Sequence, residues 1–516
     1  MNTTNTTTQE AFGHPKGLLY LFFAELWERF SFYGMRALLV LYMTKQLLFS
    51  DDMAFGVYAA YMSLVYVTPM LGGILADKIL GYRKSIMLGG ILMVFGHFFL
   101  TFEHPIFFYG SLGLIIVGNG FFKPNISSFV GALYKKEDSR RDSGFTIFYL
   151  GINLGAAIAP LACAWFAENY GWHYGFVLAG IGMIAGLLVF QRGLKSNVFG
   201  DKGFVPDTNN YNKKAFGLNK GQRIVLLAIL SVPVFATIVK FHEFEHYLVW
   251  IVSAFLIGFI IYILSVVSNK EKKRLTVAIY FTVLYTLFSA IFEQAGSSLT
   301  LFADRNVNLV GMDAAGTNSI NAGFIILFAI PFSMLWTFLT KRNKNPNSPI
   351  KFGLGLVFLG LGFVIFALSP NSMDAFAKTS MSYLVLGYLV LTIGELFLSP
   401  IGLSKMTELS PTKYIAFIMG VWFSANFYGH FFAGKIAKLT SASNGESNVF
   451  TEGIFGDVVS IVTGLQPQDV ALGSENLQQL FSYVSVYASF GIISVIVGIF
   501  AILISPFIKK MMSGVH

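Results

Sequence analysis

Seven ionisable side chains lie in the middle of long apolar stretches of this 516-residue chain. Four are carboxylates and three are cations: Glu25, Glu28, Glu293 and Glu395, and Arg29, Arg36 and Lys123. A charge at the centre of a membrane span costs about 2.5–3.5 kcal/mol, and such residues usually face an aqueous cavity or an opposite charge. If all seven were ionised, one carboxylate would lack an opposite charge, and that carboxylate is a candidate proton site. The set predicts a proton-coupled pocket of mixed charge, and the plain alternative is a group of ion pairs that only fixes helix packing.

The densest group of charges lies in one segment, which runs from Glu25 to Arg36. At about 100° per residue, the side chains of Glu25, Glu28, Arg29, Tyr33 and Arg36 fall within an arc of about 140°. One face of this helix is therefore polar, and we expect it to look into the helix bundle.

The elements that position these residues are membrane-spanning helices. The chain is 55% hydrophobic and 12% charged, whereas an average soluble domain is about 25% charged. A membrane helix needs about 20 apolar residues, and fourteen stretches qualify: 17–48, 54–76, 84–103, 106–130, 143–168, 172–192, 222–241, 247–268, 275–302, 320–340, 351–369, 380–403, 413–438 and 478–508. We therefore expect an all-α, multi-pass membrane protein, not a soluble multidomain enzyme. The single cysteine, Cys163, excludes an intrachain disulfide and a cysteine-based metal site, and we expect neither metal nor cofactor.

Basic residues orient the spans, because cytoplasmic loops carry an excess of Lys and Arg. With both termini in the cytoplasm, most of the 36 Lys and Arg residues fall on the cytoplasmic side. The net charge of +9 is then a topology signal, and nucleic acid is not an expected partner.

The order of the spans predicts two halves. Residues 17–192 form an N-terminal six-helix bundle, and residues 275–510 form a C-terminal one. Between them lie a cytoplasmic linker, 193–221, and a two-helix insertion, 222–268, for which we expect no transport role because its charges lie near its ends. A polar surface loop is expected at 439–477, on the outer face. In transporters built from two halves, the binding site lies near the midplane between them.

The motifs resemble those of the proton-coupled oligopeptide transporter family, within the major facilitator superfamily. The run Glu25-x-x-Glu28-Arg29 with Tyr33 and Arg36 resembles the first-helix signature of that family. Further similar segments follow in the family's order: Gly73 to Lys84 with Asp77, Lys123-Pro124-Asn125, Phe145 to Gly155 with Asn153, Glu293-Gln294, Asn321, Glu395 to Pro400, and Trp422. The resemblance covers residues 17–510. It implies a major facilitator fold with the two-helix insertion that bacterial members carry.

The resemblance also implies a central pocket and names its residues. The lining would be Arg29, Tyr33, Arg36, Tyr66, Lys123, Asn153, Asn321, Glu395, Ser399 and Trp422. The carboxylate of a bound peptide would meet Arg29 and Lys123, and its ammonium would meet Glu395 near Asn321.

The same resemblance implies how the pocket would be coupled to protons and gated. Protons would bind at Glu25, Glu28 and Glu293. Salt bridges Lys123–Glu395 and Arg36–Glu293 would join the halves. Asp77 would act as a gate latch.

Two positions depart from the family's pattern. Ala59 stands where animal members and some bacterial members have a proton-linked histidine, so protons would run through carboxylates alone. Ser289 stands where many members have a tryptophan, which would alter the preference for peptide side chains.

The function implied by the resemblance is transport, not catalysis. The chain would import di- and tripeptides by proton symport through the bacterial inner (plasma) membrane, with the proton gradient as its energy source. Alternatives are the same fold with another small solute such as nitrate, a multi-pass membrane enzyme, and a nutrient receptor that does not transport. An anion would leave Glu395 without an ammonium partner, which argues against nitrate.

Overall fold

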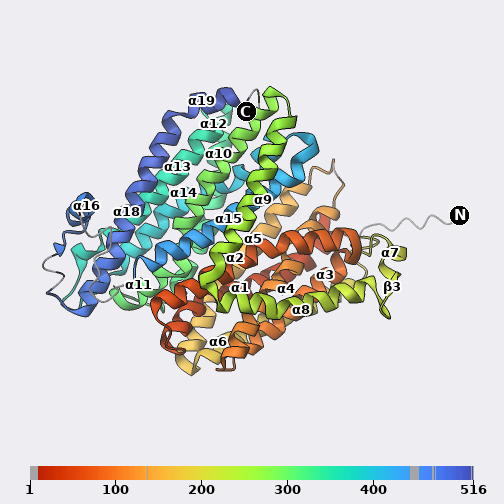
Figure 1. The fold of residues 1–516 in the computed structure, drawn as a ribbon, viewed down its shortest axis with the longest axis horizontal. Coiled ribbons are helices and arrows are strands. Elements are labelled where there is room, and N and C mark those ends of the chain that lie inside the picture. The colour runs from red at the N-terminus through yellow and green to blue at the C-terminus, as the bar shows by residue number, and fades with distance from the viewer. Residues whose placement is uncertain are drawn as a thin grey trace. The chain divides into compact units, whose positions relative to one another are not determined.

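The computed structural model describes residues 10–135, 137–441, 453–467, 470, 472–512 and 514. This part of the chain is mostly helical (Figure 1). The strands are short: β1 (Glu10–Ala11) pairs with β2 (His14–Pro15) and β3 (Lys214–Ala215) with β4 (Leu218–Asn219), both antiparallel, and β5 (Val307–Asn308) pairs in parallel with β6 (Thr379–Ser380). The predicted all-α class is confirmed.

The predicted membrane spans correspond to helices. Among the described residues, 11 helical runs are long and apolar enough to cross a membrane, by length and composition. One of these runs, Asp51–Phe99, holds both α2 (Asp51–Leu75) and α3 (Gly81–Phe99), which the π-helical turn η1 (Ala76–Leu80) joins. Two further long helices, α1 (Gly17–Lys45) and α15 (Ile415–Lys438), account for the remaining predicted spans.

The chain forms two compact units whose boundary does not follow whole helices. Unit 1 comprises Met1–Tyr42 and Leu64–Phe241, and unit 2 comprises Met43–Ser63 and His242–His516. The hairpin 43–63, made of the end of α1 and the first half of α2, therefore belongs to unit 2. The predicted bundle boundaries, 17–192 and 275–510, stay predictions.

Unit 1 is built around close helix crossings. Besides parts of α1 and α2, it contains α3, α4 (Pro105–Ala132), α5 (Arg141–Tyr170), α6 (Trp172–Lys195), α7 (Thr208–Asn212) and α8 (Lys220–Lys240). Gly72 of α2 lies so close to α4 that a Cβ on it would be 1.9 Å from the carbonyl oxygen of Gly120. Small residues permit such contacts between membrane helices, and α3 and α4 lie side by side (Figure 1).

The segment predicted as a cytoplasmic linker is anchored on unit 1. Arg83, at the start of α3, donates side-chain hydrogen bonds to the carbonyl oxygens of Gly200 and Lys202, both at 2.7 Å. Its backbone N–H donates to the carbonyl of Gly203 at 3.0 Å, and its guanidinium lies 3.7 Å from the ring centre of Phe204. The linker is thus held against the residues that resemble the superfamily's loop motif.

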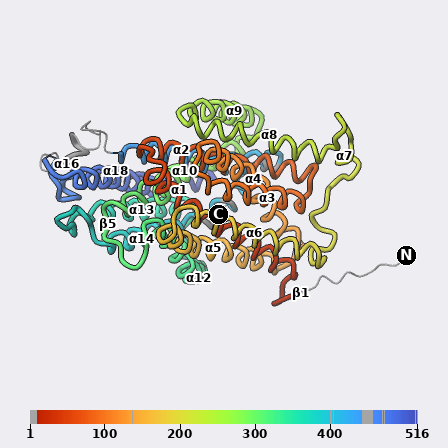
Figure 2. The backbone as a smooth tube through the Cα atoms, turned by 90° about the horizontal axis from the view of Figure 1, so that it is seen from below, coloured from red at the N-terminus to blue at the C-terminus, as the bar shows by residue number. Residues whose placement is uncertain are grey.

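The two helices of the predicted insertion pack in different units. In unit 1, α8 runs along α4 (Figures 1 and 2), and a Cβ on Gly113 would lie 2.6 Å from the carbonyl oxygen of Val232. In unit 2, α9 (Glu245–Val266) packs on α15, where the rings of Phe259 and Phe417 are 4.3 Å apart. The Glu245 side chain at the start of α9 is 5% exposed. A carboxylate in the connecting turn is therefore buried.

Unit 2 contains the remaining helices. They are η2 (His242–Phe244), α9, α10 (Asn269–Phe292), η3 (Glu293–Gly296), α11 (Ser298–Asn306), η4 (Ala315–Asn318), α12 (Ser319–Lys341), α13 (Ser348–Ala367), η5 (Ser369–Ser372), α14 (Met381–Leu409), η6 (Thr412–Tyr414), α15, α16 (Gly453–Thr463), α18 (Glu475–Leu503) and α19 (Ser505–Met511). The helices α13 and α18 run side by side, with Gly360 against the backbone of Gly491. The segment predicted as a polar loop, 439–477, contains α16, and its residues 442–452 lie outside the described part.

Candidate functional site

The charged face of α1 is buried in unit 1, as its helical periodicity predicts. The exposed fractions of Glu25, Glu28 and Arg29 are 1%, 0% and 1%. The guanidinium of Arg29 donates two hydrogen bonds to the Glu28 carboxylate, and its Nε lies 3.4 Å from Oε1 of Glu25. One buried cation is therefore shared by two carboxylates, and the three groups together carry a net negative charge when all are ionised.

A close helix contact and two aromatic rings position Arg29. A Cβ on Gly155 of α5 would lie 2.6 Å from the carbonyl oxygen of Leu26 and 2.9 Å from Cβ of Arg29. The guanidinium carbon lies 5.0 Å from the ring centre of Phe32 and 5.9 Å from that of Tyr33. Such distances allow cation–π attraction. The position of Arg29 thus depends on α5 as well as on its own helix.

Other predicted site residues of unit 1 lie in the same region. The Nζ atom of Lys123 is 4.7 Å from the ring centre of Tyr66, and Lys123 interacts electrostatically with Glu25. The guanidinium of Arg36 is 5.9 Å from the ring of Tyr33. These contacts bring Lys123 and Tyr66 together, and they connect Arg36 and Arg29 through one tyrosine ring.

Asn153 is buried in α5 with an exposed fraction of 6%. Its Nδ2 donates to the carbonyl of Tyr149, one turn earlier, at 3.0 Å. The amide orientation is therefore set by its own helix.

In unit 2 the partly buried carboxylate of Glu395 is held by an amide. Nδ2 of Asn321, on α12, donates to Oε2 of Glu395, on α14, at 3.0 Å. The same amide nitrogen lies 2.9 Å from Oγ1 of Thr392, one turn before Glu395. The predicted neighbours Asn321 and Glu395 thus bind each other directly.

Glu293 lies at the point where α10 ends and the 3₁₀ turn η3 begins. Its side chain is largely buried, and Oε1 lies 3.8 Å from Nε2 of His430 on α15. It also interacts electrostatically with Glu395. Sequence reasoning missed His430, because the search for charges inside the spans left histidine out. A search that included histidine finds it within the span 413–438.

Trp422 lies in an aromatic stack in unit 2. Its ring lies 4.6 Å from that of Tyr285 at an interplanar angle of 19°, and Phe352 packs against it at 6.3 Å. A Cβ on Gly402 would lie 2.2 Å from the Trp422 ring. Residues of α10, α13 and α14 therefore contact the Trp422 ring. The side chain of Ser399, on α14, lies outside the described part of the chain.

The roles predicted for gating stay predictions. The bridges Lys123–Glu395 and Arg36–Glu293 each pair a residue of unit 1 with a residue of unit 2. Asp77 is exposed on η1, where it interacts with Tyr82 of the same unit.

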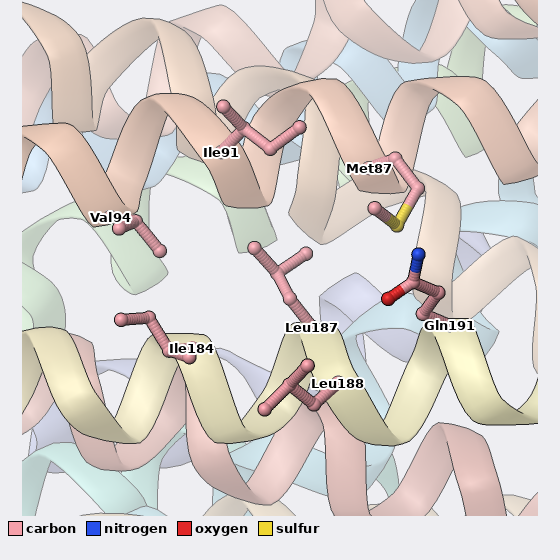
Figure 3. A pocket seen from close by; sticks show the side chains of 7 residues that line it. All are labelled: Met87, Ile91, Val94, Ile184, Leu187, Leu188 and Gln191. Carbon is pink, nitrogen blue, oxygen red and sulfur yellow. The ribbon is translucent and has the colours of Figure 1, made fainter.

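A groove of about 230 Å³ lies between α3 and α6 of unit 1 (Figure 3). Its lining is apolar apart from one amide: Met87, Ile91, Val94, Ile184, Leu187, Leu188 and Gln191. It contains none of the predicted site residues and no ionisable side chain, so it lacks the charges that a zwitterion would need. The candidate site therefore rests on the charged clusters. Among the described residues, no group of three or more His, Cys, Asp and Glu side chains could hold a metal ion.

The comparison with protein families matches residues 83–452 to the POT family. An uncharacterized transporter, YclF of Bacillus subtilis (strain 168), is 37% identical over 517 residues, which cover 98% of this chain and 96% of the relative. A di-/tripeptide transporter of Lactococcus lactis subsp. lactis (strain IL1403) is 34% identical, over 90% of this chain and 97% of the relative.

Solved structures of peptide transporters are similar to this chain over almost its whole length. The peptide transporter POT, crystallised in complex with alafosfalin, matches with a TM-score of 0.80 and 31% identity. The match covers 98% of both chains. The sequence expectation of a major facilitator type of membrane fold is therefore confirmed over almost the whole chain.

Proposed function

The chain belongs to the POT family, and from this premise we propose that it is a symporter that imports di- and tripeptides together with protons by alternating access. The relatives support this proposal, since one is named a di-/tripeptide transporter and another is a peptide transporter of known structure.

The proposal is carried by charged groups of both signs that neighbouring side chains hold in place: Arg29 is buried, and Lys123 and Glu395 are partly buried. Arg29 and Lys123 are cations held in unit 1, and Glu395 is a carboxylate held by Asn321 in unit 2. A peptide is a zwitterion, and each of its termini needs an opposite charge once it leaves water, because an unpaired buried charge costs several kcal/mol. We infer that Arg29 and Lys123 bind the peptide carboxylate and that Glu395 binds the ammonium.

The other lining residues would act on the middle of the peptide. Tyr33, Tyr66, Asn153, Asn321 and Ser399 offer hydrogen-bonding groups, Arg36 adds positive charge, and Trp422 offers a flat apolar wall. Recognition through termini and backbone tolerates many side chains, so we expect broad peptide specificity.

Protons would drive the cycle through the buried carboxylates. In this proposal the bridges Lys123–Glu395 and Arg36–Glu293 open and close as substrate and protons bind, with Glu25 and Glu28 as further proton sites and Asp77 as a latch. The gradient supplies about 2.3 kcal/mol per charge per 100 mV, and about 1.36 kcal/mol for each pH unit. We propose that the chain uses no cofactor and catalyses no reaction.

The chain is a multi-pass membrane transporter by family and by its candidate spans. We propose that it lies in a bacterial inner membrane with both termini in the cytoplasm, because most of its basic residues then face the cytoplasm.

Uptake into proteoliposomes tests the proposal. The purified chain should accumulate a labelled dipeptide such as dialanine when the outside is acidic and only equilibrate it without a gradient. Counterflow should be supported by dialanine and not by nitrate. Nitrate counterflow without dialanine counterflow would favour the alternative solute, and turnover of a lipid substrate without uptake would favour an enzyme.

We expect Glu293→Gln to abolish gradient-driven uptake and to spare dipeptide counterflow. The amide keeps the size of the side chain and cannot release a proton, so coupling is lost while substrate exchange continues. Both rates are measured in the same proteoliposomes. Driven uptake at the wild-type rate would contradict the proton role of Glu293.

A further inference from the structure

We propose that His430 is the proton partner of Glu293, so that the coupling proton is shared between an imidazole and a carboxylate. The inference deepens the proposed function and rests on it, since it concerns the same proton step. Nε2 of His430 and Oε1 of Glu293 are 3.8 Å apart, and both side chains lie inside unit 2 with exposed fractions of 1% and 11%.

Small residues bring the two helices together at this point. A Cβ on Gly429 of α15 would lie 2.3 Å from Oγ of Ser289 on α10. Ser289 is one turn before Glu293, and Gly429 directly precedes His430. A larger residue at either position would separate the helices and the two ionisable groups. The serine that departs from the family's tryptophan is thus part of this contact.

The helix register is set by a second contact on the next turn. Nε2 of Gln294 donates to the carbonyl of Ala433, on α15, at 2.9 Å. This hydrogen bond connects the residue after Glu293 with the residue one turn after His430. Contacts on both sides of the pair hold α10 against α15. The packing of these two helices therefore fixes the distance between His430 and Glu293.

The charged groups near the pair come from its own helix and from neighbouring elements. On α14, Glu395 interacts electrostatically with Glu293. The hairpin 43–63 presents Ala59, which contacts Gly434. On α15 itself, Lys435 and Lys438 lie further along the helix, where they interact with Glu245 of α9. Arg36 of unit 1 is the partner proposed for Glu293 in the cycle. Nε2 of His430 lies 3.8 Å from the Glu293 carboxylate, and histidine is the side chain type whose ordinary pKa lies near neutral pH.

The proton step balances in charge. A neutral His430 takes one proton on Nε2 from hydronium of the acidic aqueous phase, which leaves a water molecule, and the pair changes from a net charge of −1 to 0. The proton then moves to Oε1 of Glu293, which leaves a neutral imidazole and a carboxylic acid. A hydrogen bond needs about 2.7–3.2 Å, so a shift of about one ångström or a bridging water connects the two atoms. Release on the other side of the membrane reverses these steps.

The test compares the pH dependence of transport in His430→Gln with that of the wild type. Glutamine can still donate a hydrogen bond to Glu293, and it cannot carry the proton. An isolated histidine titrates near pH 6.5 and a glutamate near pH 4.3, so we expect gradient-driven uptake of dialanine to shift to acidic pH by about one unit or more. Dialanine counterflow should keep its wild-type rate.

A matched control is His97→Gln, because His97 is also buried in a helix but lies on α3 of unit 1. Its pH profile should be that of the wild type. An unchanged pH profile in His430→Gln would overturn the inference, and so would an equal shift of the profile in His97→Gln.

Infrared titration keeps the inference testable if His430→Gln loses transport altogether. The carboxyl band that disappears in Glu293→Gln reports the protonation of Glu293 in purified protein. Its titration midpoint should move when His430 is replaced by Gln or by Asn, and an unmoved midpoint would overturn the pairing. If the wild-type protein showed no proton-driven uptake, the proposed function would be wrong. The carboxyl band of Glu293 would still report whether His430 and Glu293 interact.

Discussion

Asn321 orients the partly buried side chain of Glu395. It donates to Oε2 of Glu395 at 3.0 Å and lies 2.9 Å from the hydroxyl of Thr392. A carboxylate without such a donor would turn to other partners, because buried polar groups require hydrogen bonds. The amide therefore keeps Glu395 in one orientation, and we propose that the ammonium of a peptide binds the carboxylate in this orientation.

We expect Asn321→Leu to weaken the binding of dialanine by about ten-fold or more. A hydrogen bond to a charged group is worth about 1.5–3 kcal/mol, and the leucine has nearly the same size. The affinity is measured by competition in counterflow. Thr392→Val, which leaves the bond to Glu395 in place, should have a smaller effect. N-acetyl-dialanine has no ammonium, so its weak binding should not change, and an equal loss for both ligands would contradict the role of Glu395.

The helices of unit 1 are positioned by glycines whose missing side chains leave room for a neighbouring backbone. Gly155 lets α5 reach the carbonyl of Leu26 and the Cβ of Arg29. Gly110, in α4, has nothing within 4 Å of the place where a Cβ would lie. Gly155 therefore permits a close helix contact, whereas Gly110 takes part in none among the described residues.

We expect Gly155→Ala to lower the apparent unfolding temperature of the purified protein, because the added methyl group meets a backbone oxygen at 2.6 Å. Overpacking of this kind costs about 1–3 kcal/mol. Gly110→Ala should leave the temperature unchanged or raise it, since alanine is favoured over glycine in a helix by about 1 kcal/mol. Equal shifts in both variants would show that the contact at Arg29 is not tight.

The whole molecule divides in an unexpected place, because the hairpin 43–63 belongs to unit 2. Ion pairs join this hairpin to other parts of unit 2. Arg305 binds the carboxylate of Asp51 through two nitrogens, with one bond of 2.8 Å. Lys438 and Asp52 are 2.8 Å apart, and Lys45 and Asp304 are 2.6 Å apart.

We expect the Asp51–Arg305 pair to contribute measurably to stability, because two-nitrogen pairing with a partly buried carboxylate is the stronger kind of ion pair. Asp51→Arg and Arg305→Asp should each lower the apparent unfolding temperature, and the double swap should recover most of the loss. The Lys45–Asp304 pair is the control. Lys45 is half exposed, and exposed pairs are worth about 0–1 kcal/mol, so Lys45→Glu should change little. Failure of the double swap to recover stability would rule out a direct pairing.

Parts of the candidate site follow from local sequence. The polar face of α1 is predicted by the spacing of Glu25, Arg29 and Arg36, since these positions repeat with the helical period. The hydrogen bond between Asn321 and Glu395 could not be derived in that way, because the residues lie 74 positions apart. The family resemblance implied only that the two lie near each other. His430 itself is visible in the sequence within the span 413–438, but its contact with Glu293 joins two helices and could not be derived from either one.

The sequence by itself determined that the chain is a bundle of membrane helices with charges inside the spans. Hydrophobic length and the cost of a charge in lipid are properties of each segment, so they can be evaluated without knowing its neighbours. Only the tertiary structure decided that Ser289 and Gly429 bring His430 to Glu293, that Arg83 holds the linker, and that the insertion is shared between two units. These outcomes depend on which small residues meet across helices, and no single segment contains that information.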